Sequence, residues 1–343
     1  MRISQNYASS GLSADSFSLV VFNGAGVLQR NFTNSFEWDG DSFLGSDGVF
    51  TTVMDTYQQI EVDMVEVNRS FTVSPRESFY LVEYSLRNPT SQPLRIRLLD
   101  YVVSGKGGQV SASYNEQEGL YVADETNAGS FFLASGVLND SSISRLLSVG
   151  VSASDSGSLV SQFSRTFDIS SQKSASASQV AMGSVVEVLL GGGASTTLTF
   201  FRTLQRTVSD CLAVSHRVRS KSPLQWKAQT AENNAHFLSS GVSPPLNGRL
   251  KTLYEHSVLN LKNSSVLLVF DKKLNLKFFL KKRQSPGIGA FVASFHPEYG
   301  MRSWARDGSF SAFIMDSAGY HQESEQFLQY LSKVPLRGDG AFQ

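Results

Sequence analysis

The first part of the chain, residues 1–204, consists of short apolar runs separated by turn signals. The runs are rich in β-branched and aromatic residues. Leu94 to Leu98 alternates strictly between apolar and polar residues, which places one face in a core and the other in water. Many short strands without helical periodicity are typical of an antiparallel sandwich. We therefore expect strands over residues 16–22, 60–67, 79–86, 94–98, 119–123, 130–134, 185–190 and 196–202.

A serine-rich tract covers residues 152–179. Such a composition carries no catalytic chemistry of its own, and the polar residues outnumber the apolar ones. We expect this tract to form loops and exposed strand faces.

The hydrophobic period changes to that of a helix after Arg202. Apolar residues near helical spacing predict a helix from Val208 to Val218, and the basic residues that follow suit a helix C-terminus. Pro223 separates it from a second predicted helix, Trp226 to Leu238. We interpret residues 205–245 as a helical linker.

The last part, residues 246–343, contains amphipathic patterns that predict helices over residues 246–261, 307–318 and 320–331, with Gly319 as a stop. Each pattern has an apolar stripe that needs a neighbouring helix to cover it. Because few helices are present, we expect large apolar side chains to face water: Leu250, Leu253, Phe310, Phe313, Phe327 and Leu331.

The charge balance excludes two classes of partner. The chain has 343 residues, and its 30 basic and 30 acidic residues give a net charge of zero. That balance gives no electrostatic reason to expect nucleic acid or an anionic membrane as a partner. No apolar stretch approaches the length of a membrane span, and the first residues contain no signal-peptide core. We favour the cytoplasm, and leave the compartment and the oligomeric state open.

The residues that commonly bind metals are sparse. Cys211 is the single cysteine, so no internal disulfide can form, and its place in a helical pattern predicts a buried structural thiol. The five histidines show neither metal-ligand spacing nor a cysteine partner. We expect no metal ion and no organic cofactor.

Aromatic and charged residues combine in a run near the C-terminal end, from Tyr299 to Phe310. Tyr299 and Trp304 offer flat apolar faces for the C–H groups of a pyranose. Arg306 and Asp307 supply a fixed donor and a fixed acceptor for vicinal hydroxyls. The run leads into a predicted helix, so we predict a sugar-binding site made of these four residues.

The order of these parts and the motifs within them resemble glycoside hydrolase family 15, the glucoamylases and glucodextranases of bacterial type. The residues that carry the resemblance are 77–98, 294–308, 318–320 and 327–331. It implies an N-terminal β-supersandwich, a helical linker and an (α/α)6 barrel. It also implies that Tyr299, Trp304, Arg306 and Asp307 bind the terminal glucose of an α-glucan or maltooligosaccharide. The implied activity is exo-acting, inverting hydrolysis that releases glucose from non-reducing ends.

The chain departs from the family pattern in two places. The run 338–343 matches a segment that follows the second barrel helix in the family, whose two catalytic glutamates come later. We therefore expect the barrel to be incomplete, the chain to be an inactive fragment, and no catalytic residue to lie within it. Residues 270–282, rich in Lys, Leu and Phe, interrupt the family path. They are either a gene-model artefact, which we favour, or a genuine basic insertion.

Two alternatives to the glucoamylase interpretation stay open. One is a non-catalytic glycan-binding or regulatory module with a glucoamylase-like barrel. The other is a trehalase of the same family. The sequence fixes neither the preferred linkage nor the preferred chain length.

Overall fold

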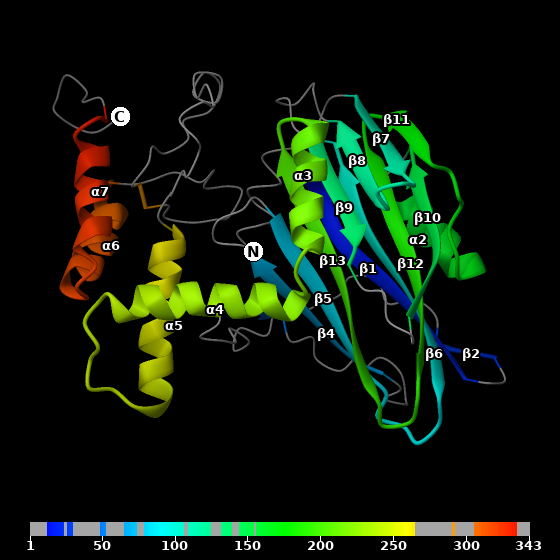
Figure 1. Cartoon of the computed structure of the whole chain (residues 1–343), viewed down its shortest axis with the longest axis horizontal. Helices are drawn as coiled ribbons and strands as arrows, with labels where there is room; N and C mark the ends of the chain where they lie inside the picture. The colour runs from blue at the N-terminus through cyan, green and yellow to red at the C-terminus, as the bar shows by residue number, and fades with distance from the viewer. Residues whose placement is uncertain are drawn as a thin grey trace. The chain divides into compact units, whose positions relative to one another are not determined.

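The computed structural model describes residues 12–23, 26–29, 49–52, 65–73, 79–105, 109–124, 132–138, 144–153, 156–264, 290–291 and 305–334. The described residues fall into two compact units, which meet in sequence between Lys227 and Ala228. We call the part up to Lys227 the sandwich unit and the part from Ala228 onward the helical unit. The boundary lies inside the segment 205–245 that we interpreted as a linker (Figure 1).

The sandwich unit contains two antiparallel sheets (Figure 1). The five-stranded sheet has the order β10 (Ser144–Ser152), β12 (Val180–Leu190), β6 (Leu94–Ser104), β1 (Leu12–Asn23) and β2 (Gly26–Gln29). The eight-stranded sheet has the order β11 (Ser174–Ala177), β7 (Val110–Asn115), β8 (Leu120–Asp124), β9 (Phe132–Val137), β13 (Ser195–Gln205), β5 (Phe79–Arg87), β4 (Glu66–Val73) and β3 (Val49–Thr52). The expected antiparallel β structure followed by helices is confirmed.

The two sheets pack face to face around a shared core. The rings of Phe17 on β1 and Tyr84 on β5 meet edge to face with centroids 4.9 Å apart. The hydroxyl of Tyr121 on β8 donates to the carbonyl of Gly183 on β12. These contacts join the two sheets, and each sheet buries the apolar positions of its alternating strands.

Most of the predicted strands are present. Residues 60–64 of the predicted strand 60–67 lie outside the described residues, and β4 begins at Glu66. β6 continues to Ser104, beyond the predicted end at Leu98, because β1 and β12 pair with it on both sides over that length. Strands β2, β3, β7, β10 and β11 were not predicted. In β7 and β11 serine alternates mainly with alanine, which is too small to give a strong apolar signal.

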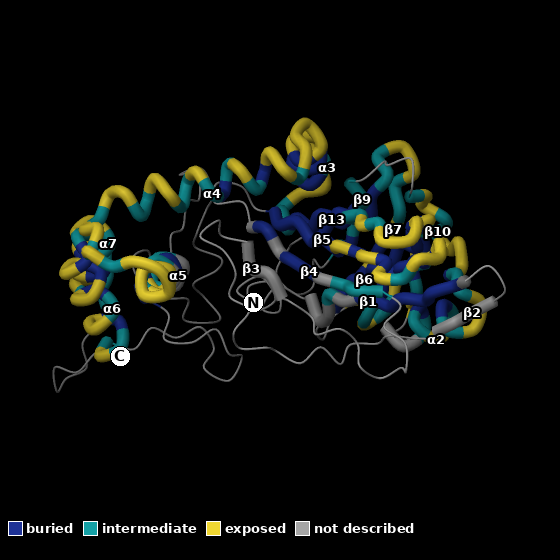
Figure 2. Tube along the Cα trace, turned by 90° about the horizontal axis from the view of Figure 1, so that it is seen from below, coloured by how far each residue is buried: buried dark blue, intermediate teal, exposed yellow. Residues whose placement is uncertain are grey.

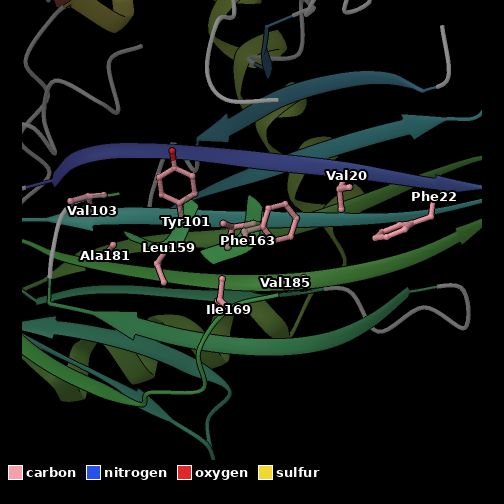
Figure 3. Packing of buried hydrophobic residues seen from close by; sticks show 10 residues of the cluster. Val20, Phe22, Tyr101, Val103, Leu159, Phe163, Ile169, Ala181 and Val185 are labelled. Carbon is pink, nitrogen blue, oxygen red and sulfur yellow. The ribbon is translucent and has the colours of Figure 1, made fainter. Parts of the chain in front are cut away.

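The prediction for the serine-rich tract was wrong in one part. Residues Ser156–Thr166 form helix α2. Leu159 and Phe163, four residues apart, lie on one face of the helix and pack against Tyr101 and Val185 on the outer face of the five-stranded sheet (Figure 3). Serines occupy several of the other positions. Two apolar residues at helical spacing therefore decide the structure, and the average composition does not.

Helix α3 (Val208–Arg219) covers part of the outer face of the eight-stranded sheet, as the helical spacing predicted. Its first turn is capped by Thr207, whose hydroxyl accepts from the backbone N–H of Asp210 at 3.0 Å. Cys211 and Val218 pack in a cluster with Phe201 of β13. The next helix, α4 (Pro223–Ser239), begins at a proline, which suits a first helical position.

The thiol of Cys211 gives a direct test of this packing. Cys211 is buried and burial raises its pKa to about 12, with a smaller contribution from Asp210. Almost no thiolate exists at pH 8, and the thiolate is the reactive form. We expect iodoacetamide to leave the native protein unlabelled at pH 8 and to label it fully in urea. Rapid labelling of the native protein would contradict the burial of this side chain.

The helical unit contains the end of α4 and helices α5 (Gly248–Ser264), α6 (Ala305–Ser317) and α7 (His321–Leu331). Gly319 ends α6 with a φ of +84°, a left-handed conformation that favours glycine. Among the described residues these helices do not close a barrel, so the expected (α/α)6 barrel is not shown. No helix in the described part of the chain is long and apolar enough to cross a membrane.

Four of the six apolar side chains predicted to face water are exposed, Phe327 is buried, and Leu331 is half-buried. Leu250, Leu253, Phe310 and Phe313 are 61% to 68% exposed. Figure 2 shows exposed stretches on α5, α6 and α7. Phe327 is 1% exposed, so the prediction that it faces water was wrong.

Phe327 is buried because Gly308 on α6 leaves room for its ring. A Cβ atom at that position would lie 2.5 Å from the ring of Phe327, so glycine lets α6 and α7 approach closely. Phe291, Met315 and Val258 complete the small core around the ring, and Leu331 is half-buried beside it.

Candidate functional site

Arg306 and Asp307 lie in the first turn of α6. The guanidinium Nη2 of Arg306 is 3.5 Å from Oδ1 of Asp307, and the two side chains are 80% and 39% exposed. A carboxylate in the first turn is favoured by the helix dipole. Tyr299 and Trp304, the other two predicted sugar-binding residues, lie outside the described residues.

Helix α7 contacts α6 at Gly308 and Ala312. Besides the contact of Gly308 with Phe327, the hydroxyl of Ser324 donates to the backbone carbonyl of Ala312 at 2.6 Å. The hydroxyl of Ser311 donates to the carbonyl of Asp307 at 3.0 Å. The backbone under Arg306 and Asp307 is therefore fixed, while both side chains remain accessible.

This arrangement can bind hydroxyl groups. A guanidinium group donates only, and a carboxylate accepts only, so a pair of adjacent hydroxyls can satisfy both at once. Charge-assisted hydrogen bonds of this kind are stronger than neutral ones. No group of three residues able to hold a metal ion occurs in the described part of the chain.

The sequence analysis missed a set of charged residues inside the sandwich. We call it the core charge network, and its members come from both sheets: Asp15, Arg69, Tyr80, Tyr84, Asp100 and Arg202.

Arg202 lies at the centre of this network and is fully buried. Its Nη2 donates to Asp100, its Nε lies 3.4 Å from Oδ2 of Asp15, and its Nη1 donates to the hydroxyl of Ser135 at 2.8 Å. Arg69 donates to Oδ1 of Asp15 at 2.6 Å. Two guanidinium groups thus face two carboxylates, and the formal charges cancel.

The network shifts the ionisation of its members. Burial opposes the charged form of Asp15, but the guanidinium groups of Arg202 and Arg69 outweigh it and lower the pKa of that carboxyl. Burial likewise opposes the charge on Arg202, while Asp100 and Asp15 raise its pKa. Because each carboxylate is already paired, we assign this network to joining the two sheets and not to binding a ligand.

One signal in the sequence points to the network. Asp100 follows Leu98 at a two-residue interval within an apolar strand, so alternation places its carboxylate inside the sandwich. Arg202 likewise follows Leu198 and Phe200 at two-residue intervals in β13, so alternation places its side chain inside the sandwich as well. Opposite charges at inward positions of two apolar strands indicate a buried pair.

Comparison with known proteins identifies a solved structure with a similar fold. No protein-family model matches the sequence, and no curated protein matches it significantly. A solved structure of a bacterial glucoamylase complexed with acarbose matches with a TM-score of 0.63 at 12% identity, over 93% of this chain and 45% of that one. Weaker matches include two family GH92 enzymes of Bacteroides thetaiotaomicron. They are an inverting mannosidase (TM-score 0.40, 11% identity, 71% of this chain and 29% of that one) and an α-mannosidase (TM-score 0.39, 10% identity, 72% and 32%).

The match to the glucoamylase shows that this chain shares the fold of part of that protein. The chain spans less than half the length of that protein, 45%.

Proposed function

We propose that this chain is part of a glucoamylase-like glycoside hydrolase that releases glucose from the non-reducing ends of α-glucans. The observation that carries the proposal is the exposed Arg306–Asp307 pair on a fixed helix start, in a chain whose fold matches a glucoamylase. Tyr299 and Trp304 would add apolar faces against the terminal sugar. The substrates are α-glucans or maltooligosaccharides, and no cofactor takes part.

The role of the pair is to orient the terminal glucose. Two fixed hydrogen-bonding groups hold a sugar ring in one register, and orientation of this kind removes part of the activation barrier. Inverting hydrolysis then needs a carboxylic acid that protonates the glycosidic oxygen and a carboxylate that activates water on the opposite face. We assign neither role to a residue of this chain, so other segments of the whole protein would supply both groups.

The helical unit supports a place in an (α/α)6 barrel. Leu250 and Leu253 on α5 and Phe310 and Phe313 on α6 are large, apolar and exposed. An apolar helix face of this size is stable when other helices cover it. In this proposal those residues contact further barrel helices, and the sandwich unit is the supersandwich that supports the barrel.

Substitution of the pair tests the sugar site. Arg306→Ala or Asp307→Ala is expected to weaken binding of acarbose roughly tenfold, because each removes a charge-assisted hydrogen bond. Isothermal titration calorimetry on the full chain measures the dissociation constant. Asp316→Ala is the matched control, since Asp316 is an exposed acid near the other end of the same helix that pairs with His321 at 2.6 Å. If the control and both variants bind alike, the sugar-site assignment fails.

A further inference from the structure

A groove on the sandwich unit stands apart from the residues discussed so far. Its volume is about 620 Å3, and its floor is formed by Glu83 on β5 with Thr197 and Thr199 on β13. The turn between α3 and α4 and the side chain of Lys227 form the wall. Cavities of this size are large enough to bury a small ligand.

The sequence of the two strands explains where the groove lies. On the outer face of the eight-stranded sheet, Phe79, Leu81 and Phe201 are covered by α3 and the start of α4. The next outward positions are Glu83 and Thr199, which are register partners. The helix covers the apolar end of this face, and the polar end remains as the floor of the groove.

Glu83 and Lys227 provide a fixed pair of opposite charges. Oε2 of Glu83 lies 2.8 Å from Nζ of Lys227, and their side chains are 3% and 31% exposed. The hydroxyl of Thr72 lies 3.5 Å from the same carboxylate oxygen. The carboxylate is therefore held at one place, with an ammonium group beside it.

Thr199 supplies a hydroxyl to the lining of the groove. The residue is 1% exposed. Its carbonyl is satisfied separately by the N–H of Leu138 at 2.8 Å. The side-chain hydroxyl of Thr199 can both donate and accept, so it can pair with a hydroxyl group of a ligand.

We propose that this groove binds a neutral saccharide or related polyol. A carboxylate beside an ammonium group can accept from one hydroxyl and donate to its neighbour, while the hydroxyl of Thr199 does either. A metal ion would have to displace Lys227 from Glu83. Arg219 and Lys221 also line the groove, and their side chains can donate to hydroxyl oxygens of a saccharide. Leu138, Pro223 and Leu224 give the lining an apolar side for the C–H groups of a sugar.

Hydrogen exchange on the full chain locates the binding. With millimolar maltotriose, amide protection is expected in β13 and in residues 219–227. Thr199→Val keeps the side-chain volume and is expected to weaken this site roughly fivefold, and Lys227→Gln roughly tenfold. Thr196→Val is the matched control, because Thr196 lies on the opposite face of the same strand and should leave the protection unchanged.

The outcomes separate this site from the Arg306–Asp307 site. Protection in β13 that persists in Arg306→Ala supports the groove whether or not the proposed function is correct. Protection confined to α6, or unchanged by Thr199→Val and Lys227→Gln, overturns the proposal. If inorganic phosphate protects β13 and maltotriose does not, the groove binds anions and the proposal is also overturned.

Discussion

Replacing Arg202 with methionine is expected to destabilise the sandwich unit by about 3–5 kcal/mol, the usual effect of breaking a buried ion pair. Arg202 is fully buried and is within reach of both Asp100 and Asp15. Without it, Asp100 keeps the hydrogen bond from Tyr84 at 2.8 Å, but no longer has the guanidinium group that balances its charge. The loss therefore comes from a buried charge without a partner and exceeds the net value of one hydrogen bond.

Urea unfolding of the variant measures this effect as a lower midpoint at an unchanged slope. Arg87→Met is the matched control, since Arg87 on the same sheet pairs with Glu66 at 2.8 Å but is 55% exposed. An exposed pair contributes about 0–1 kcal/mol, so the control should unfold close to the wild type. Arg202→Met combined with Asp100→Leu should be less destabilised than the sum of the two single variants. If Arg202→Met and Arg87→Met unfold at the same urea midpoint, the core charge network does not stabilise the sandwich unit.

The same network predicts a direction for the effect of pH. The pKa of Asp15 is lowered in the folded state, so its ionisation stabilises the fold fully above its unfolded pKa of about 3.9. That stabilisation is lost as the pH falls through the lower folded pKa. Asp100 contributes in the opposite direction, because burial raises its pKa. We therefore expect the difference in the free energy of unfolding between the wild type and Asp15→Asn to shrink below about pH 4.

The strands could be predicted because their signal is local. Alternation between apolar and polar residues needs no knowledge of the partner strand, and it identified β5 and β13 within a few residues and the start of β6. The core charge network could not be predicted as a unit. Asp100 and Arg202 are 102 residues apart, and only the packing of two different sheets brings them together.

The same limit applies to the candidate sites. Arg306 and Asp307 are adjacent in sequence, so their proximity needed no structure. The groove depends on the pairing of Glu83 with Thr199 across two strands and on the position of Lys227 in a helix. Sequence periodicity likewise finds an apolar stripe but not the neighbour that covers it, which is why Phe327 was placed in water.

A few apolar residues at helical spacing hold helix α2 on the sheet within a serine-rich segment. Phe163 is fully buried, and it joins α2 to the outer face of the five-stranded sheet together with Leu159 (Figure 3). Removing a buried aromatic ring loses its transfer free energy and leaves a cavity that the surroundings fill only in part. Phe163→Ala is therefore expected to destabilise the sandwich unit by about 3–5 kcal/mol.

The control for this variant is Leu189→Ala on β12 of the same sheet. Leu189 is 62% exposed, so its truncation should change the free energy of unfolding by no more than about 0.5 kcal/mol. Thermal unfolding of both variants gives the comparison, and Phe163→Leu should recover part of the loss because it refills part of the cavity. If Phe163→Ala and Leu189→Ala unfold at the same temperature, α2 does not pack on the sheet. The serine-rich tract would then be the loop that its composition suggests.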